Sequence, residues 1–118
     1  MREYKFRGKR EDANVWIYGY VFKTRKSNPM FEETTWIFNE DGKFKVEPVS
    51  VGQYTGLEDK NGMEIYEGDI IKDRYHKGEV VYDDYIGAFA WSGGEDWGMI
   101  FANDVEVIGN IHEQGGHT

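Results

Sequence analysis

Apolar and polar residues alternate over short stretches of this chain, and most of these stretches end at a residue that favours a turn. A period of two is typical of β-strands, whereas no window of ten or more residues has the 3.6-residue period of a helix. We therefore predict an all-β protein with at most a 3₁₀ turn around residues 102–104. The expected strands are residues 4–8, 15–22, 34–38, 44–46, 63–66, 70–72, 79–82, 86–91, 97–101 and 105–111.

The stretch 15–22 is unusual because both of its predicted faces are apolar. One face consists of Trp16, Tyr18, Tyr20 and Phe22. The other consists of Val15, Ile17, Gly19 and Val21. Such a strand needs cover on both sides, either as a central strand between two layers or with one face completed by another subunit. The second alternative makes the four aromatic residues candidates for self-association.

Turn signals divide the chain into two parts. Residues 23–33 are polar and form an expected loop, and residues 39–42 supply a hairpin turn. Pro48 then ends strand pairing, so we place a boundary at residues 47–51. Residues 1–48 are the predicted N-terminal β subdomain. Residues 49–118 hold a run of short, closely spaced strands, which is typical of a small SH3-like barrel, and we expect both parts to share one core.

The charge is distributed unevenly along a chain whose net charge is −8. Residues 1–27 carry eight basic and three acidic side chains, a net of +5, whereas the remainder carries six basic and nineteen acidic ones, a net of −13. The two parts could pair electrostatically, or the basic part could meet an anionic partner. The candidate anion-contacting residues are Arg2, Lys5, Arg7, Lys9 and Arg10.

Composition narrows the class of protein further. With 118 residues, 39% of them hydrophobic and 16% aromatic, the chain can form a folded core. It has no cysteine, which excludes disulfides, thiolate metal sites and cysteine nucleophiles. No apolar run is long enough for a signal peptide or a membrane span. We expect a cytoplasmic protein without membrane contact.

Metal binding and catalysis find little support in the sequence. Carboxylates between Asp59 and Asp69 are spaced like ligands of a hard cation, but Gly62 comes too early for a calcium loop, so a turn is favoured. The histidines at positions 76, 112 and 117 lack metal-ligand spacing. Paired acids at 83–84 and 95–96 would point to opposite strand faces. We therefore predict no metal, no cofactor and no enzymatic activity.

A second group of aromatic residues lies in the C-terminal part. Its candidate partner-binding members are Tyr75, Tyr82, Tyr85, Trp91 and Trp97, and Phe89 lies among them. Aromatic side chains on a small barrel can stack on bases, but the acidic charge of this part would repel phosphates. Nucleic acid is thus an improbable ligand for it, and the rings are interpreted as core or as a subunit contact.

One long string resembles a known family. Residues 52–71, GQYTGLEDKNGMEIYEGDII, are similar to the signature of the YopX-like family of phage and prophage proteins. The strings EYKFRGKR, WIYGYVF and VEVIGNIHE resemble the two ends of that family, so the similarity covers nearly the whole chain. The resemblance implies an SH3-like barrel in the C-terminal part and expression inside a bacterial host. It implies no catalytic residues, because the family has no assigned activity.

Three functional hypotheses follow. The first is a non-enzymatic phage accessory protein whose barrel is an interaction module and which self-associates through residues 16–22. The second is an acidic phosphate mimic that inhibits a host nucleic-acid-binding protein. The third is weak nucleic-acid binding through the basic N-terminal stretch. The expected partners are a second copy of the chain and a host or phage protein.

Overall fold

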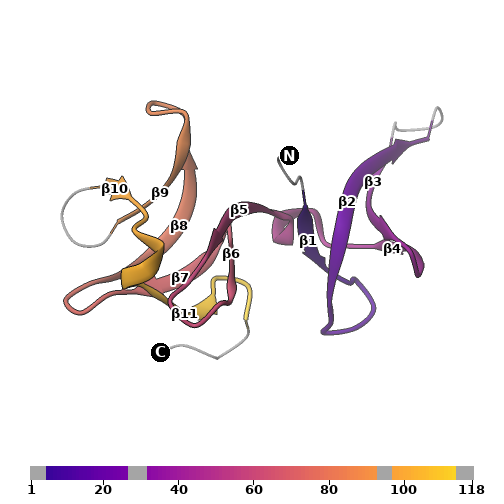
Figure 1. Ribbon diagram of the computed structural model, residues 1–118. Coiled ribbons are helices and arrows are strands. Elements are labelled where there is room, and N and C mark those ends of the chain that lie inside the picture. Colours follow the sequence, from indigo (N-terminus) through magenta and orange to yellow (C-terminus); the bar gives the residue numbers. More distant parts are fainter. Residues whose placement is uncertain (1–4, 27–31, 93–96, 114–118) are drawn as a thin grey trace. The chain divides into compact units, whose positions relative to one another are not determined.

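The computed structural model describes residues 5–26, 32–92 and 97–113, and the chain divides into two compact units, residues 1–53 and 54–118 (Figure 1). The described residues form eleven strands and two 3₁₀ turns. All strand pairs are antiparallel. The all-β prediction is confirmed, including the 3₁₀ turn at residues 102–104. Within the part that the structure describes, no helix has the length and apolarity to cross a bilayer.

The N-terminal unit is built on one antiparallel sheet. Its elements are β1 (Phe6–Lys9), β2 (Trp16–Arg25), β3 (Glu33–Asn39), β4 (Gly42–Lys45), the 3₁₀ turn η1 (Pro48–Ser50) and the start of β5 (Gly52–Glu58). The strand order is β4-β3-β2-β1, and the first two residues of β5 pair with β1. The β2 strand runs three residues past the predicted end, because its pairing with β3 continues to Arg25.

This sheet curls so that the end of β4 returns to the end of β1. Arg10 and Val46 form an antiparallel bridge, and the N–H of Glu47 donates to the carbonyl of Lys9 at 2.8 Å. The inner face buries Ile37 and Val46 completely. A Cβ at position 8 would lie 3.0 Å from the side chains of both, so Gly8 lets β1 approach them closely.

Gly19 brings β2 unusually close to β3. A Cβ at this position would lie 2.2 Å from the carbonyl oxygen of Phe38, a distance that no real side chain tolerates. The Nδ2 amide of Asn39 donates to the carbonyl of Tyr18 at 2.9 Å and holds the two strands together beside this glycine. Glycine at position 19 is therefore required by the close approach of two backbones.

The C-terminal unit contains the rest of β5 and six further strands. These are β6 (Glu64–Tyr66), β7 (Asp69–Lys72), β8 (Lys77–Asp83), β9 (Ala88–Ser92), β10 (Trp97–Met99) and, after the 3₁₀ turn η2 (Ala102–Asp104), β11 (Glu106–Asn110). Five of them form a sheet in the order β10-β9-β8-β7-β11. In the described residues this sheet is open, so a closed SH3-like barrel is not observed.

One apolar cluster forms the centre of this unit. Its buried members are Ile65, Ile71, Val80, Trp91 and Val105, contributed by β6, β7, β8, β9 and the segment before β11. Predicted strand 86–91 begins two residues later than expected, because residues 86 and 87 belong to the turn. The proposal that residues 1–48 and 49–118 are subdomains sharing one core stays a prediction.

Candidate functional site

The outer face of the N-terminal sheet carries six aromatic side chains, which we call the aromatic face. They are Trp16, Tyr18, Tyr20 and Phe22 on β2 and Trp36 and Phe38 on β3. They share one face because side chains alternate along a strand and the register pairs Tyr20 with Phe38 and Phe22 with Trp36. On the opposite face of these strands lie the buried side chains of Ile37, which belongs to β3, and Val46, which follows β4.

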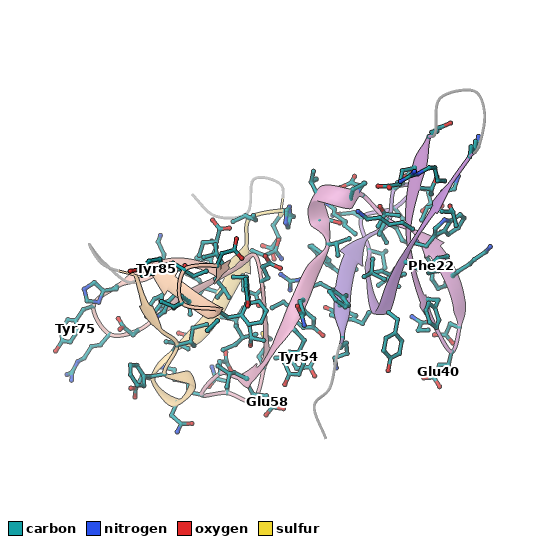
Figure 2. All side chains as sticks on the ribbon, turned by 90° about the horizontal axis from the view of Figure 1, so that it is seen from above. Phe22, Glu40, Tyr54, Glu58, Tyr75 and Tyr85 are labelled. Atoms are coloured by element: carbon teal, nitrogen blue, oxygen red, sulfur yellow. The ribbon has the colours of Figure 1, made fainter. Side chains whose placement is uncertain are left out.

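The sequence predicts that both faces of β2 are covered by other parts of the protein. In the described residues, the aromatic face is left partly exposed. Tyr18, Tyr20 and Phe38 keep 45%, 56% and 45% of their surface exposed. β2 pairs with a strand on each edge, but Tyr18 and Tyr20 on its aromatic side are exposed, so the expected position between two layers is not observed in the described residues. Around Tyr18, Tyr20 and Phe38 this face therefore stays partly exposed, and Figure 2 labels Phe22 on the same face.

Ring contacts hold the aromatic face in a fixed arrangement. The rings of Tyr20 and Phe38 lie 5.5 Å apart, and Phe22 stacks on Trp36 at 6.1 Å with an interplanar angle of 8°. Phe22 also meets Phe38 edge-on at 5.7 Å. The indole N–H of Trp36 donates to the hydroxyl of Thr24 at 2.9 Å. A partner would thus meet rings that are already ordered, which lowers the entropy lost on binding.

Cations border the aromatic face on the two strands that flank β2 and β3. On β4, the ammonium groups of Lys43 and Lys45 lie 4.8 Å and 5.7 Å from the Trp36 ring. On β1, the guanidinium of Arg7 lies 4.6 Å from the Trp16 ring. These distances are within the range of cation–π attraction. No acidic residue occupies a strand position on this face in β1 to β4, because the single acid in these strands, Glu33, pairs with Lys23 on the other side.

The predicted anion-contacting residues do not form one exposed patch. Arg2 lies outside the described residues, Lys5 is partly buried, and Arg7 and Lys9 are buried. The Arg10 guanidinium donates two hydrogen bonds of 2.8 Å to Asp12 and thereby holds the pKa of that carboxyl below its ordinary value. Much of the basic charge in β1 is therefore engaged within the protein.

A pocket of about 210 Å³ lies between the segment after β1 and strand β4. It is lined by Arg10, Glu11, Asp12, Lys43, Phe44 and Lys45. Because the Arg10 guanidinium is already paired with Asp12 and lies 5.4 Å from the Phe44 ring, its charge is largely neutralised within the pocket wall.

The predicted partner-binding aromatics separate into two environments. Tyr75, Tyr82 and Tyr85 are exposed, with Tyr75 in the turn before β8 and Tyr85 in the turn after it (Figure 2). Trp91 is only 6% exposed and belongs to the core, so it does not contribute to a surface. Trp97 starts β10, and its side chain lies outside the described part. The five residues therefore do not form one face.

The carboxylates whose spacing resembled that of cation ligands accept hydrogen bonds that stabilise turns. Asp59 accepts N–H groups of Asn61 and Met63 at 2.8 and 2.9 Å through Oδ1, and the N–H of Val107 at 2.8 Å through Oδ2. Burial raises the pKa of Asp59, but the donors of Val107, Met63 and Asn61 together hold the pKa below its ordinary value. The predicted turn at residues 59–62 is confirmed.

Other titratable groups in this unit follow the same pattern. Asp69 accepts the N–H of Tyr66 at 2.7 Å, and Glu64 accepts the hydroxyl of Tyr66 at 2.9 Å. The N–H groups of Tyr75 and His76 lower the pKa of Asp73. Among the residues that the structure places, no group of three or more histidines and acids has the geometry of a metal site.

Sequence reasoning found the β2 half of the aromatic face and missed the rest. Trp36 and Phe38 alternate in β3, and Lys43 and Lys45 alternate in β4, so each pair has a signal of period two. Their placement beside β2 depends on the registers of the β2–β3 and β3–β4 pairs, which the alternation alone does not determine.

Comparison with known proteins gives one result. A family model described as YopX protein matches residues 5–116, which is nearly the whole chain. Comparison with curated proteins gave no match.

Proposed function

Since this chain belongs to the YopX protein family, we propose that it is a non-enzymatic interaction module that self-associates through its aromatic face. We place it among accessory proteins of phages and prophages, acting in the cytoplasm of the bacterial host. The observation that carries the proposal is a set of large aromatic side chains left open on an otherwise folded sheet.

Exposed aromatic clusters of this kind are typical of protein interfaces. Tyrosine, tryptophan and phenylalanine are enriched at the centres of such interfaces, where they lose little conformational entropy. Tyr18, Tyr20 and Phe38 are about half exposed, although ring contacts already fix their neighbours. Covering these rings removes apolar surface from water, which is the main driving force of association.

The proposal that the protein is not an enzyme is supported by how its perturbed carboxyl groups are used. In the described residues, a lowered pKa is found for Asp12, Asp59 and Asp73. Asp12 is held by an arginine, and the other two mainly by backbone N–H groups. Such groups are anions with structural partners rather than acids or bases poised near neutral pH.

For the C-terminal unit we propose an opened variant of the SH3-like barrel. Five short antiparallel strands joined mostly by tight turns, β7 to β11, support this. A crystal structure in which β5 and β6 close the sheet against its edge strands would establish the barrel, and one in which both edges stay unpaired would refute it.

Size-exclusion chromatography with light scattering tests self-association. We expect wild-type protein to rise from the mass of one chain toward that of two or more as its concentration increases. The variant Tyr20→Ser/Phe38→Ser is expected to stay at the mass of one chain. Tyr75→Ser, which removes an exposed tyrosine from the other unit, is the matched control and should behave as wild type.

Two outcomes would overturn the proposal. One is a wild-type protein that remains a single chain at millimolar concentration. The other is retardation of a labelled single-stranded oligonucleotide at low salt that the Tyr20→Ser/Phe38→Ser variant abolishes, because this result assigns the aromatic face to nucleic acid.

A further inference from the structure

The hairpin of β8 and β9 extends past the other strands of the C-terminal unit (Figure 1). At its base, Val80 pairs with Trp91 and both are buried in the core. The next pair on the same face is Tyr82 and Phe89, whose rings meet edge-on at 5.2 Å. Tyr82 is 46% exposed, so the apolar side of the hairpin continues beyond the buried core.

The turn at the end of this hairpin combines acidic residues with large apolar ones, and we call it the acidic tip. It consists of Asp83, Asp84, Tyr85 and Ile86. Tyr85 is 96% exposed, and about half of Ile86 is exposed. The turn itself is well braced, because the Asp83 carboxylate accepts the N–H of Tyr85 and the Asp83 carbonyl accepts that of Gly87, both at 2.8 Å. The tip is thus a formed structure that displays a tyrosine.

The charges of the two units are opposite. Residues 1–53 contain ten basic and eight acidic side chains, a net of +2, whereas residues 54–118 contain four basic and fourteen acidic ones, a net of −10. On the aromatic face, the exposed cations Lys43 and Lys45 stand beside the rings. The aromatic face and the acidic tip are therefore complementary in charge, and each leaves aromatic surface in water.

A two-fold contact between two aromatic faces lacks this complementarity. No strand position of the face in β1 to β4 carries an acid, so the charges that these strand positions bring to such a contact are all positive. Like charges brought together at an interface oppose association, whereas opposite charges steer it and fix its register. A contact between the face of one copy and the tip of another places Asp83 and Asp84 near Lys43 and Lys45.

We propose that the aromatic face is occupied by the acidic tip of a second copy of this chain. The inference rests on the proposed self-association and adds its geometry. Because face and tip are different surfaces, the contact is head to tail, and each copy in a pair keeps one unused face or tip. Association therefore continues into open chains or closes as a ring, rather than stopping at a two-fold dimer.

Two variants with complementary defects test this arrangement. The face variant is Tyr20→Ser/Phe38→Ser, and the tip variant is Asp84→Lys/Tyr85→Ser, which leaves the structural Asp83 in place. Each variant alone should have the mass of one chain by light scattering. An equimolar mixture should have the mass of two chains, because the intact face of one variant binds the intact tip of the other.

The control Tyr75→Ser should associate as wild type, and added salt should weaken the mixed pair. Circular dichroism and thermal melting establish that each variant is folded, and Lys43→Glu/Lys45→Glu replaces the first face variant if it is not. A tip variant that associates as strongly as wild type overturns the head-to-tail contact and leaves self-association through the face intact. A mixture that stays at the mass of one chain also overturns it, whereas a monomeric wild type removes both proposals.

Discussion

Asp59 links two segments of the C-terminal unit that are far apart in the sequence. We predict that replacing it causes one of the largest losses of stability among single substitutions in this unit. Its side chain is only 6% exposed, and its two oxygens accept three backbone N–H groups. Two donors belong to the turn between β5 and β6. The third, from Val107, lies 48 residues further along the chain and ties β11 to that turn.

The expected loss follows from these three bonds. A hydrogen bond to a charged group contributes about 1.5–3 kcal/mol, and contributions that share one carboxylate are not additive. Water that enters the space left by Asp59→Ala satisfies part of the lost bonding, so we expect a loss of about 3 kcal/mol in the free energy of unfolding. Asp59→Asn keeps one acceptor oxygen and should lose about 2 kcal/mol.

Urea denaturation followed by tryptophan fluorescence measures both values. The matched control is the exposed Asp84→Asn, which should change the free energy of unfolding by less than about 0.5 kcal/mol. A loss below about 1 kcal/mol for Asp59→Ala, with an unchanged m-value, would refute the reasoning, since the three N–H groups would then be satisfied without the carboxylate.

Three further predictions concern the backbone, the core and acid. Gly19→Ala places a Cβ against the carbonyl of Phe38 and should cost about 2–3 kcal/mol by thermal melting; an unchanged melting temperature would contradict the close approach. Ile65→Ala should cost about 2–5 kcal/mol in urea, with the exposed Ile86→Ala as a near-neutral control; equal losses would argue against the core. The stability should fall as the pH drops below about 4. The pKa of Asp59 is lowered in the folded state, so protonation of its carboxyl favours unfolding, and Asp59→Asn should flatten this dependence. A variant with the acid profile of the wild type would rule out Asp59 as the source.

Alternation along the chain predicted the local structure well because each strand carries its own signal. The four even-numbered aromatics of β2 lie on one face as expected, and turns at Asn61-Gly62 and at residues 39–42 follow from residues that tolerate a positive φ or bond their own backbone. These are properties of neighbouring residues, which a sequence displays directly.

What alternation cannot give is the partner of each strand. Trp91 and Tyr85 are both aromatic residues of one hairpin, yet the first is buried and the second is almost fully exposed. The difference arises because the hairpin extends beyond the buried apolar core. The extent of that core depends on where β7 and β11 end. The openness of the sheet likewise depends on long-range pairing, and the position of the lysines beside Trp36 depends on the register of the β3–β4 hairpin.

The bond from Val107 to Asp59 has a consequence for how the protein is made. While the ribosome has not yet released β11, the turn before β6 has its anion but lacks its most distant donor. Native contacts between residues so far apart in the chain form late, so the C-terminal unit completes its fold only after β11 has left the ribosome. Its assembly during translation is then set by the arrival of β11 rather than by the first hairpins.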